Sequence, residues 1–135
     1  MTKNIVFDSY ALLVLFRQEE GHEKISHLLT DIAMGEKNGF MCTVNVGEVY
    51  YITARKQDEK KALIALDSLR QFPIEFIEAD LPLSLASAKL KARYKMSYAD
   101  AFAAALTISK KGTLITGDKE FKHLIGETHF KVEFI

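Results

Sequence analysis

Two patterns of apolar residues alternate along the chain. Short runs rich in β-branched and aromatic residues predict strands, while segments with an apolar residue every three or four positions predict helices. The strand-like runs are NIVF at 4–7, FMCT at 40–43, IEFI at 74–77, TLIT at 113–116 and a last apolar run, VEFI, at 132–135. Helices are expected at 11–16, from Gly21 to Gly39, at 46–56, between Asp58 and Pro73, at 81–94 and at 97–109, with a short helical turn at 119–124.

The same spacing predicts which side of three helices faces the core. Apolar residues at i, i+3, i+4 and i+7 form one stripe on an otherwise polar cylinder. The inward residues expected on this basis are Ile25, Leu28, Leu29, Ile32 and Ala33 in the helix after Gly21, Ala62, Leu66 and Leu69 in the helix after Asp58, and Leu81, Leu85, Ala88 and Ala92 in the next one.

Strands that alternate with helices over the whole length predict an α/β fold with a parallel sheet covered on both faces. Each return to a parallel strand needs a crossover long enough to hold a helix. A length of 135 residues with 48% hydrophobic composition suits one well-cored domain, and no linker or repeat divides the chain. We therefore expect a single domain over residues 1–135.

Charge and cysteine content narrow the class of protein. The 18 basic and 18 acidic residues cancel, so overall charge favours neither a nucleic-acid binder nor an acidic surface. The single cysteine, Cys42, has no partner in the chain, which predicts a buried thiol in a reducing compartment. Asp8 interrupts the apolar stretch that follows Lys3, so neither export nor membrane spanning is indicated. The expected location is the cytoplasm.

Four acids are expected at one edge of the predicted sheet. Asp8 and Asp118 each follow the carboxyl end of an apolar strand, and Glu48 and Asp100 lie in helices that start at the same edge. In parallel sheets, ligands bind beyond the carboxyl ends of the strands, where the strand order reverses. If the first and fourth strands are neighbours, all four carboxylates converge.

Asp100 lies in an alanine-rich helix, SYADAFAAALTIS, with Ala103 and Ala104 on the same face. An ionised carboxylate on so apolar a face is costly unless it is neutralised or hydrogen-bonded. Each acid also has a purely structural explanation. Ser97 and Asp100 fit a capping box, Asp8 could cap a helix, Asp118 could be a turn residue, and Glu48 could be solvated. Those explanations do not account for all four acids meeting at one edge.

Four like charges held together need a cation. Oxygen ligands without cysteine or histidine favour Mg²⁺ or Mn²⁺ over zinc, and Mg²⁺ commonly shares its ligands with substrate phosphates. Such a metal generates a hydroxide nucleophile and neutralises charge on the phosphate, which is the chemistry of phosphodiester hydrolysis. The four histidines, His22, His27, His123 and His129, lack ligand spacing and are expected on the surface.

The segments NIVFDSYALL, VGEVYY, YADAFAAAL and LITGDKEF resemble the PIN-domain ribonucleases, and among them the VapC-like toxins of toxin-antitoxin pairs. The resemblance implies a three-layer α/β/α fold with strand order 3-2-1-4-5, a homodimer, and inhibition by a cognate antitoxin. It implies that Asp8, Glu48, Asp100 and Asp118 hold the metal, and that the Thr116 hydroxyl supports these ligands without binding the metal itself. Tyr10 departs from the asparagine that many relatives have at this position.

The basic run KLKARYK, with Lys89, Lys91, Arg93 and Lys95, leads into the Asp100 helix. Without the four acids, 18 basic residues face 14 acidic ones, an excess that suits binding of an RNA backbone. The alternative for this run is a solvated helix face.

Rival functions are a non-catalytic binding module of the same fold and a Mg²⁺-dependent phosphatase. The haloacid-dehalogenase-like phosphatases need a second aspartate two residues after the first, where this chain has Tyr10. A response-regulator-like phosphoacceptor module would need paired acids after the first strand, which are absent here. A metal-dependent ribonuclease is therefore the function that the sequence favours.

Overall fold

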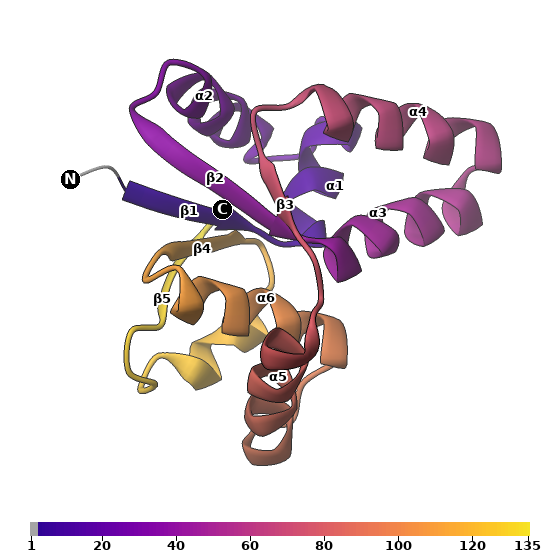
Figure 1. The fold of residues 1–135 in the computed structure, drawn as a ribbon. Helices are drawn as coiled ribbons and strands as arrows, with labels where there is room; N and C mark the ends of the chain where they lie inside the picture. The colour runs from indigo at the N-terminus through magenta and orange to yellow at the C-terminus, as the bar shows by residue number, and fades with distance from the viewer. Residues whose placement is uncertain (1–2) are drawn as a thin grey trace.

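Five parallel strands form the centre of the protein in a computed structural model that describes residues 3–135. The strands lie in the order β3-β2-β1-β4-β5 (Figure 1), which confirms the order implied by the resemblance. Their bounds are Lys3–Phe7 for β1, Lys37–Cys42 for β2, Glu75–Ile77 for β3, Thr113–Thr116 for β4 and Lys131–Phe134 for β5.

Helices cover both faces of the sheet and complete three layers. One face carries the first four helices, of which α3 and α4 form a long hairpin that extends beyond the sheet, and α5 and α6 cover the other (Figure 1). The helices are α1 (Ser9–Arg17), α2 (His22–Ala33), α3 (Thr43–Lys56), α4 (Glu59–Gln71), α5 (Leu81–Arg93), α6 (Tyr98–Ser109) and the 3-10 helix η1 (Lys119–Leu124). No helix of residues 3–135 is long and apolar enough to cross a membrane.

Strand β1 separates two hydrophobic cores. Ile5 and Phe7 pack with residues of α1 to α4, while Val6 packs with α5, α6 and η1. Successive side chains of a strand point to opposite faces, so a strand that is covered on both sides must be apolar at every position. This requirement explains why Ile5, Val6 and Phe7 are all fully buried.

The register between β1 and β4 determines which residues meet at the carboxyl ends of these two strands. Phe7 pairs with Ile115 in the parallel ladder, so Asp8 and Thr116 come next to each other where the two strands end. The chain continues from β1 to β2 on one side and has β4 on the other, which makes this the point where the strand order reverses. Open parallel sheets bind ligands there.

Gly39 was expected to end a helix, and that expectation is wrong. Helix α2 ends at Ala33, and Gly39 lies inside β2. A Cβ at Gly39 would lie 2.6 Å from Cδ1 of Ile32, so the glycine lets the helix pack closely on the strand. Ala33, expected in the inward stripe of α2, is exposed, whereas the other four residues of that stripe are buried.

The inward face predicted for α5 is also wrong. Leu81 and Leu85 are 71% and 54% exposed, and the buried residues are Leu83, Ser87 and Leu90. Ser87 satisfies its hydroxyl by donating to the Leu83 carbonyl, 2.8 Å away, so a polar side chain can occupy the inward stripe. The leucines of α5 have helical spacing on two faces, and its packing against α6 decides which face is buried.

Candidate active site

Asp8 is the most deeply buried of the four predicted acids. It follows β1 directly, is 2% exposed and caps α1 by accepting a hydrogen bond from the Ala11 N–H at 2.9 Å. Its second carboxylate oxygen, Oδ2, accepts a hydrogen bond from the Thr116 hydroxyl. Asp8 is therefore both a helix cap and a buried acid at the end of the sheet.

Thr116 connects two of the acids. Its Oγ1 donates to Asp8 and accepts the Asp118 N–H at 3.0 Å, while the threonine side chain is fully buried. Asp118 in turn caps η1, because its Oδ1 accepts the Glu120 N–H at 2.9 Å. The last residue of β4 thus fixes the positions of the acid after β1 and the acid after β4.

Glu48 points toward the same edge from α3, and it is not a solvated helix residue. Its Oε1 accepts hydrogen bonds from the Ser9 hydroxyl at 2.8 Å and from Asn45 Nδ2 at 3.0 Å. The same amide also donates to the Ala99 carbonyl at 3.2 Å, which ties α3 to the start of α6. Asn45 is fully buried, and its Oδ1 has no hydrogen-bond partner in the part of the chain that the structure describes.

Asp100 occupies the third position of α6. Ser97 caps the helix by accepting the Asp100 N–H at 3.1 Å, as the capping box predicts. Ala103 and Ala104 are fully buried one turn further on. The carboxylate therefore lies at the border between a packed apolar helix and the open edge of the sheet.

Electrostatics join these acids into one cluster. Burial is the main reason that the pKa of the Asp8 carboxyl rises from 3.8 to about 7. Hydrogen bonds from Thr116 and the Ala11 N–H act in the opposite direction, and the charges of Asp100 and Glu48 add to the rise.

Asp100 shows the same behaviour. Its pKa rises from 3.8 to about 6, first through burial and next through the charge of Asp118. Glu48 and Glu120 add smaller upward effects, and the hydrogen bond with Ser97 lowers the pKa. The four ion pairs of residues 3–135 involve none of these acids. The cluster thus concentrates negative charge without a protein cation to balance it.

The cluster has the chemical composition of a metal site, although it is not arranged as one. Within residues 3–135, no three carboxylate, imidazole or thiol groups converge to hold one ion. Protein hydrogen bonds hold Asp8, Glu48 and Asp118 in their present orientations, and like charges have the lowest energy when they point apart. A shared cation would therefore require side-chain rotation.

Three members of this arrangement were not found by sequence reasoning. Ser9, Asn45 and Glu120 were not predicted as site residues. Asn45 lies three residues before Glu48, a spacing that brings helical side chains together, so this pair could have been noticed. The contact of Ser9 with Glu48 joins residues 39 positions apart and has no local signal.

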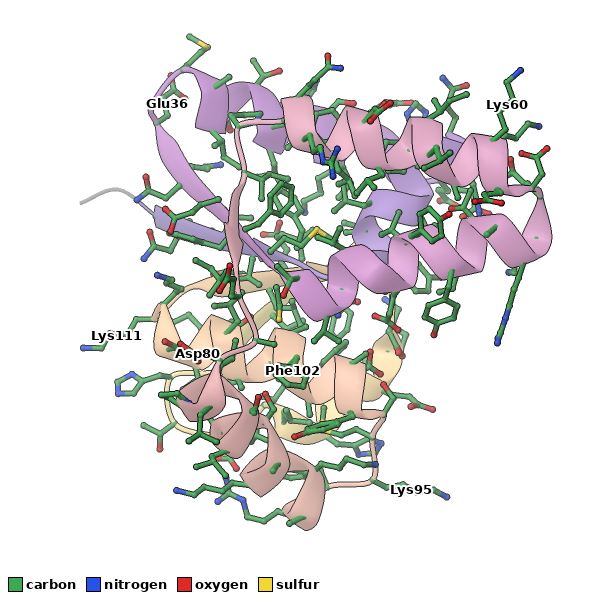
Figure 2. The ribbon with its side chains drawn as sticks, turned by 45° about the vertical axis from the view of Figure 1, so that its right-hand side comes forward. Glu36, Lys60, Asp80, Lys95, Phe102 and Lys111 are labelled. Atoms are coloured by element: carbon green, nitrogen blue, oxygen red, sulfur yellow. The ribbon has the colours of Figure 1, made fainter. Side chains whose placement is uncertain are left out.

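Two of the four basic side chains in the run KLKARYK bind other groups of the protein. Lys91 Nζ donates to the Met96 carbonyl at 2.8 Å, and Arg93 pairs with Glu127 at 2.6 Å. Lys95 projects from the turn between α5 and α6 (Figure 2), and Lys89 is exposed. An open groove of about 880 Å³ has Lys91, Arg93, Lys95, His123 and Glu120 among its lining residues.

A PIN domain model matches residues 5–126, so the chain belongs to the PIN domain family. Its fold is that of the VapC toxins of VapBC toxin-antitoxin systems. VapBC2 from Rickettsia felis bound to promoter DNA superposes with a TM-score of 0.75 at 13% identity, over 97% of this chain and 98% of that one.

Two further structures show the same fold at low sequence identity. DNA-bound VapBC from Salmonella typhimurium gives a TM-score of 0.74 at 13% identity over 99% and 98% of the two chains. VapC20 from Mycobacterium tuberculosis, described as a sarcin-ricin loop cleaving toxin, gives 0.71 at 15% over 90% and 95%. No curated protein matches the sequence.

Proposed function

We propose that this chain is a metal-dependent ribonuclease and the toxin of a toxin-antitoxin pair. The observation that carries the proposal is the group of buried and partly buried acids around Asp8. The pKa of Asp8 is raised to about 7, and the acids have no ion-pair partner among residues 3–135. A folded protein keeps such a cluster at a cost in stability. A divalent cation bound by the acids would offset that cost.

The donor set fits Mg²⁺, with Mn²⁺ as an alternative. Asp8, Glu48, Asp100 and Asp118 offer only hard oxygen ligands, and no lysine or arginine of residues 3–135 forms an ion pair with them. When bound, the metal supplies a hydroxide nucleophile and neutralises charge on the phosphate. Thr116 orients the Asp8 carboxylate through its hydroxyl hydrogen bond.

Two other residues orient Glu48. Ser9 and Asn45 both donate to Oε1, which leaves Oε2 without a hydrogen bond in residues 3–135. The two hydrogen bonds at Oε1 hold the whole carboxylate group near the edge of the sheet, and Oε2 is the oxygen left to bind a cation. A shared cation would still require this side chain to rotate.

RNA is the substrate class that the surrounding charge supports best. The groove lined by Glu120 and by Ser97, the cap of the Asp100 helix, carries Lys91, Arg93 and Lys95. Cations along a groove bind phosphates without reading bases. We therefore propose that Lys89, Lys91, Arg93 and Lys95 line the path of the RNA strand. Lys95 is available to bind phosphate, whereas Lys91 and Arg93 also bind protein groups.

We also propose a homodimer, a cognate antitoxin and a cytoplasmic location, with residues 1–135 acting as one domain. The VapBC complexes among the similar structures support the antitoxin. Leu81 and Leu85 expose a large part of their side chains on the outer side of α5, which suits burial by a second chain. Light scattering on the purified protein tests the dimer.

The function is tested with purified, partner-free protein and total RNA. Mg²⁺ should produce defined new ends that sequencing maps, EDTA should abolish them, and Asp118→Asn should reduce them strongly. Asp58→Asn is the matched control, because Asp58 caps α4 through the Lys61 N–H and lies outside the cluster. RNA that is bound but left intact would instead support a non-catalytic binding module.

A further inference from the structure

The Tyr10 ring packs closely against Gly117, in the turn that carries Asp118. A Cβ at Gly117 would overlap the ring, at 2.7 Å from Cδ1 and 2.9 Å from Cζ of Tyr10. Only glycine at position 117 allows this approach, because every other residue has a Cβ. The ring is nevertheless 47% exposed. The aromatic side chain is thus supported from one side by backbone and open on another.

The ring borders an open hollow beside the acid cluster. This hollow has a volume of about 440 Å³, and Tyr10, Val14 and Ile135 are its apolar lining residues. The four acids are not among its lining residues, but Tyr10 follows Asp8 by two residues, and Gly117 and Lys119 are the chain neighbours of Asp118. A group bound there would belong to the same substrate as the phosphate at the acids.

Charges around the hollow restrict what it can hold. Glu19 and Glu20 line it beyond the end of α1, and their carboxylates would repel a phosphate. Lys119 lines the hollow next to Asp118, with its Nζ 4.6 Å from the centre of the Phe134 ring. This distribution suits a flat neutral group in the hollow and an anionic group near Lys119.

We propose that Tyr10, supported by Gly117, is a stacking platform for one base of a single-stranded RNA whose neighbouring phosphate lies at the acids. This proposal rests on the ribonuclease function proposed above. A base presents a π-face whatever its identity, so stacking positions the strand without strict sequence preference. Tyr10 is accordingly a substrate-positioning residue, and Lys119 contacts a phosphate beside the stacked base.

The test measures binding and cleavage separately. Binding of a fluorescent RNA twelve-mer is measured at low salt with Ca²⁺ in place of Mg²⁺, since oxygen ligands also bind Ca²⁺, alongside twelve-mers that carry one abasic residue at successive positions. Tyr10→Leu should weaken binding of the intact strand by about 5- to 150-fold, which corresponds to ~1–3 kcal/mol for one stacked base. Tyr10→Phe, which keeps the ring, should bind like the wild type.

An abasic residue at one position should weaken wild-type binding to a similar extent, and Tyr10→Leu should then add little further loss. Tyr51→Leu is the matched control, since Tyr51 is 45% exposed on α3 and lies outside the hollow. Equal losses for Tyr10→Leu on intact and abasic strands, or equal losses for the Tyr10 and Tyr51 variants, would overturn the stacking platform.

Cleavage in Mg²⁺ separates this inference from the function on which it rests. RNA cleavage with no effect of Tyr10→Leu would refute the platform alone. Base-dependent binding through Tyr10 with no cleavage would support the platform and refute the ribonuclease. A wild-type protein that neither binds nor cleaves the RNA would refute the platform and the ribonuclease.

Discussion

The raised pKa of Asp8 makes the stability of the metal-free protein depend on pH in a specific direction. In the unfolded chain this carboxyl ionises near pH 3.8, whereas in the folded protein it ionises near pH 7. Between these values the native state binds more protons than the unfolded state, so the free energy of unfolding falls as pH rises. The contribution is fully present below about pH 4 and lost above about pH 7.

The magnitude follows from the two pKa values. A difference between 3.8 and about 7 corresponds to at most ~4 kcal/mol of unfolding free energy. Asp8→Asn removes the charge while keeping a side-chain oxygen that can accept the Ala11 N–H. We therefore expect the variant to be more stable than the wild type by ~1–4 kcal/mol at pH 8 in EDTA, with a much smaller difference at pH 4.5.

Urea unfolding at pH 4.5, 6 and 8 in EDTA measures this difference. Asp100 contributes a pH dependence of the same sign, since its pKa is raised to about 6, so the informative quantity is the difference between wild type and variant at each pH. Asp58→Asn is the control, because asparagine caps a helix as well as aspartate. The reasoning is refuted if Asp8→Asn is destabilising at pH 8 or keeps the wild-type pH dependence.

Three further variants test other contacts of the site. Asn45→Ala removes the donor to Glu48 and to the Ala99 carbonyl; we expect a loss of ~1–3 kcal/mol in urea unfolding and slower RNA cleavage. Ser97→Ala removes the cap of α6 and should cost ~0.5–2 kcal/mol in the same assay. Lys95→Glu should raise the apparent KM for RNA and flatten its salt dependence, with cleavage sites unchanged on sequencing; an unaltered salt slope would place the strand elsewhere.

Much of the site could be predicted because it depends on local features. Asp8 and Thr116 adjoin because each lies at the end of an apolar strand, and parallel strands present these ends at one edge. The capping alternative for Asp8 was also correct as geometry, since Asp8 caps α1, and Asp118, for which the alternative was a turn residue, caps η1. A residue can cap a helix and also belong to the acid cluster, because Asp8 and Asp118 each lie between the end of a strand and the start of the next helix.

Other features depend on packing that no local pattern records. The face of α5 was mispredicted because leucines at 81, 83, 85 and 90 satisfy helical spacing on more than one side. Packing against α6 selects the buried side. The hydrogen bond of Ser9 to Glu48 likewise requires α1 and α3 to be placed against each other first.

Metal dependence of cleavage tests the central claim most directly. The measurement is the initial rate of cleavage of one mapped RNA as Mn²⁺ is added to EDTA-stripped protein, for the wild type and for Asp100→Asn. We expect no cleavage by the stripped wild type, a rate that rises and saturates with Mn²⁺, and little cleavage by Asp100→Asn at any concentration. Cleavage that persists without metal, or wild-type rates and metal dependence in Asp100→Asn, would contradict a metal-dependent site built from these acids.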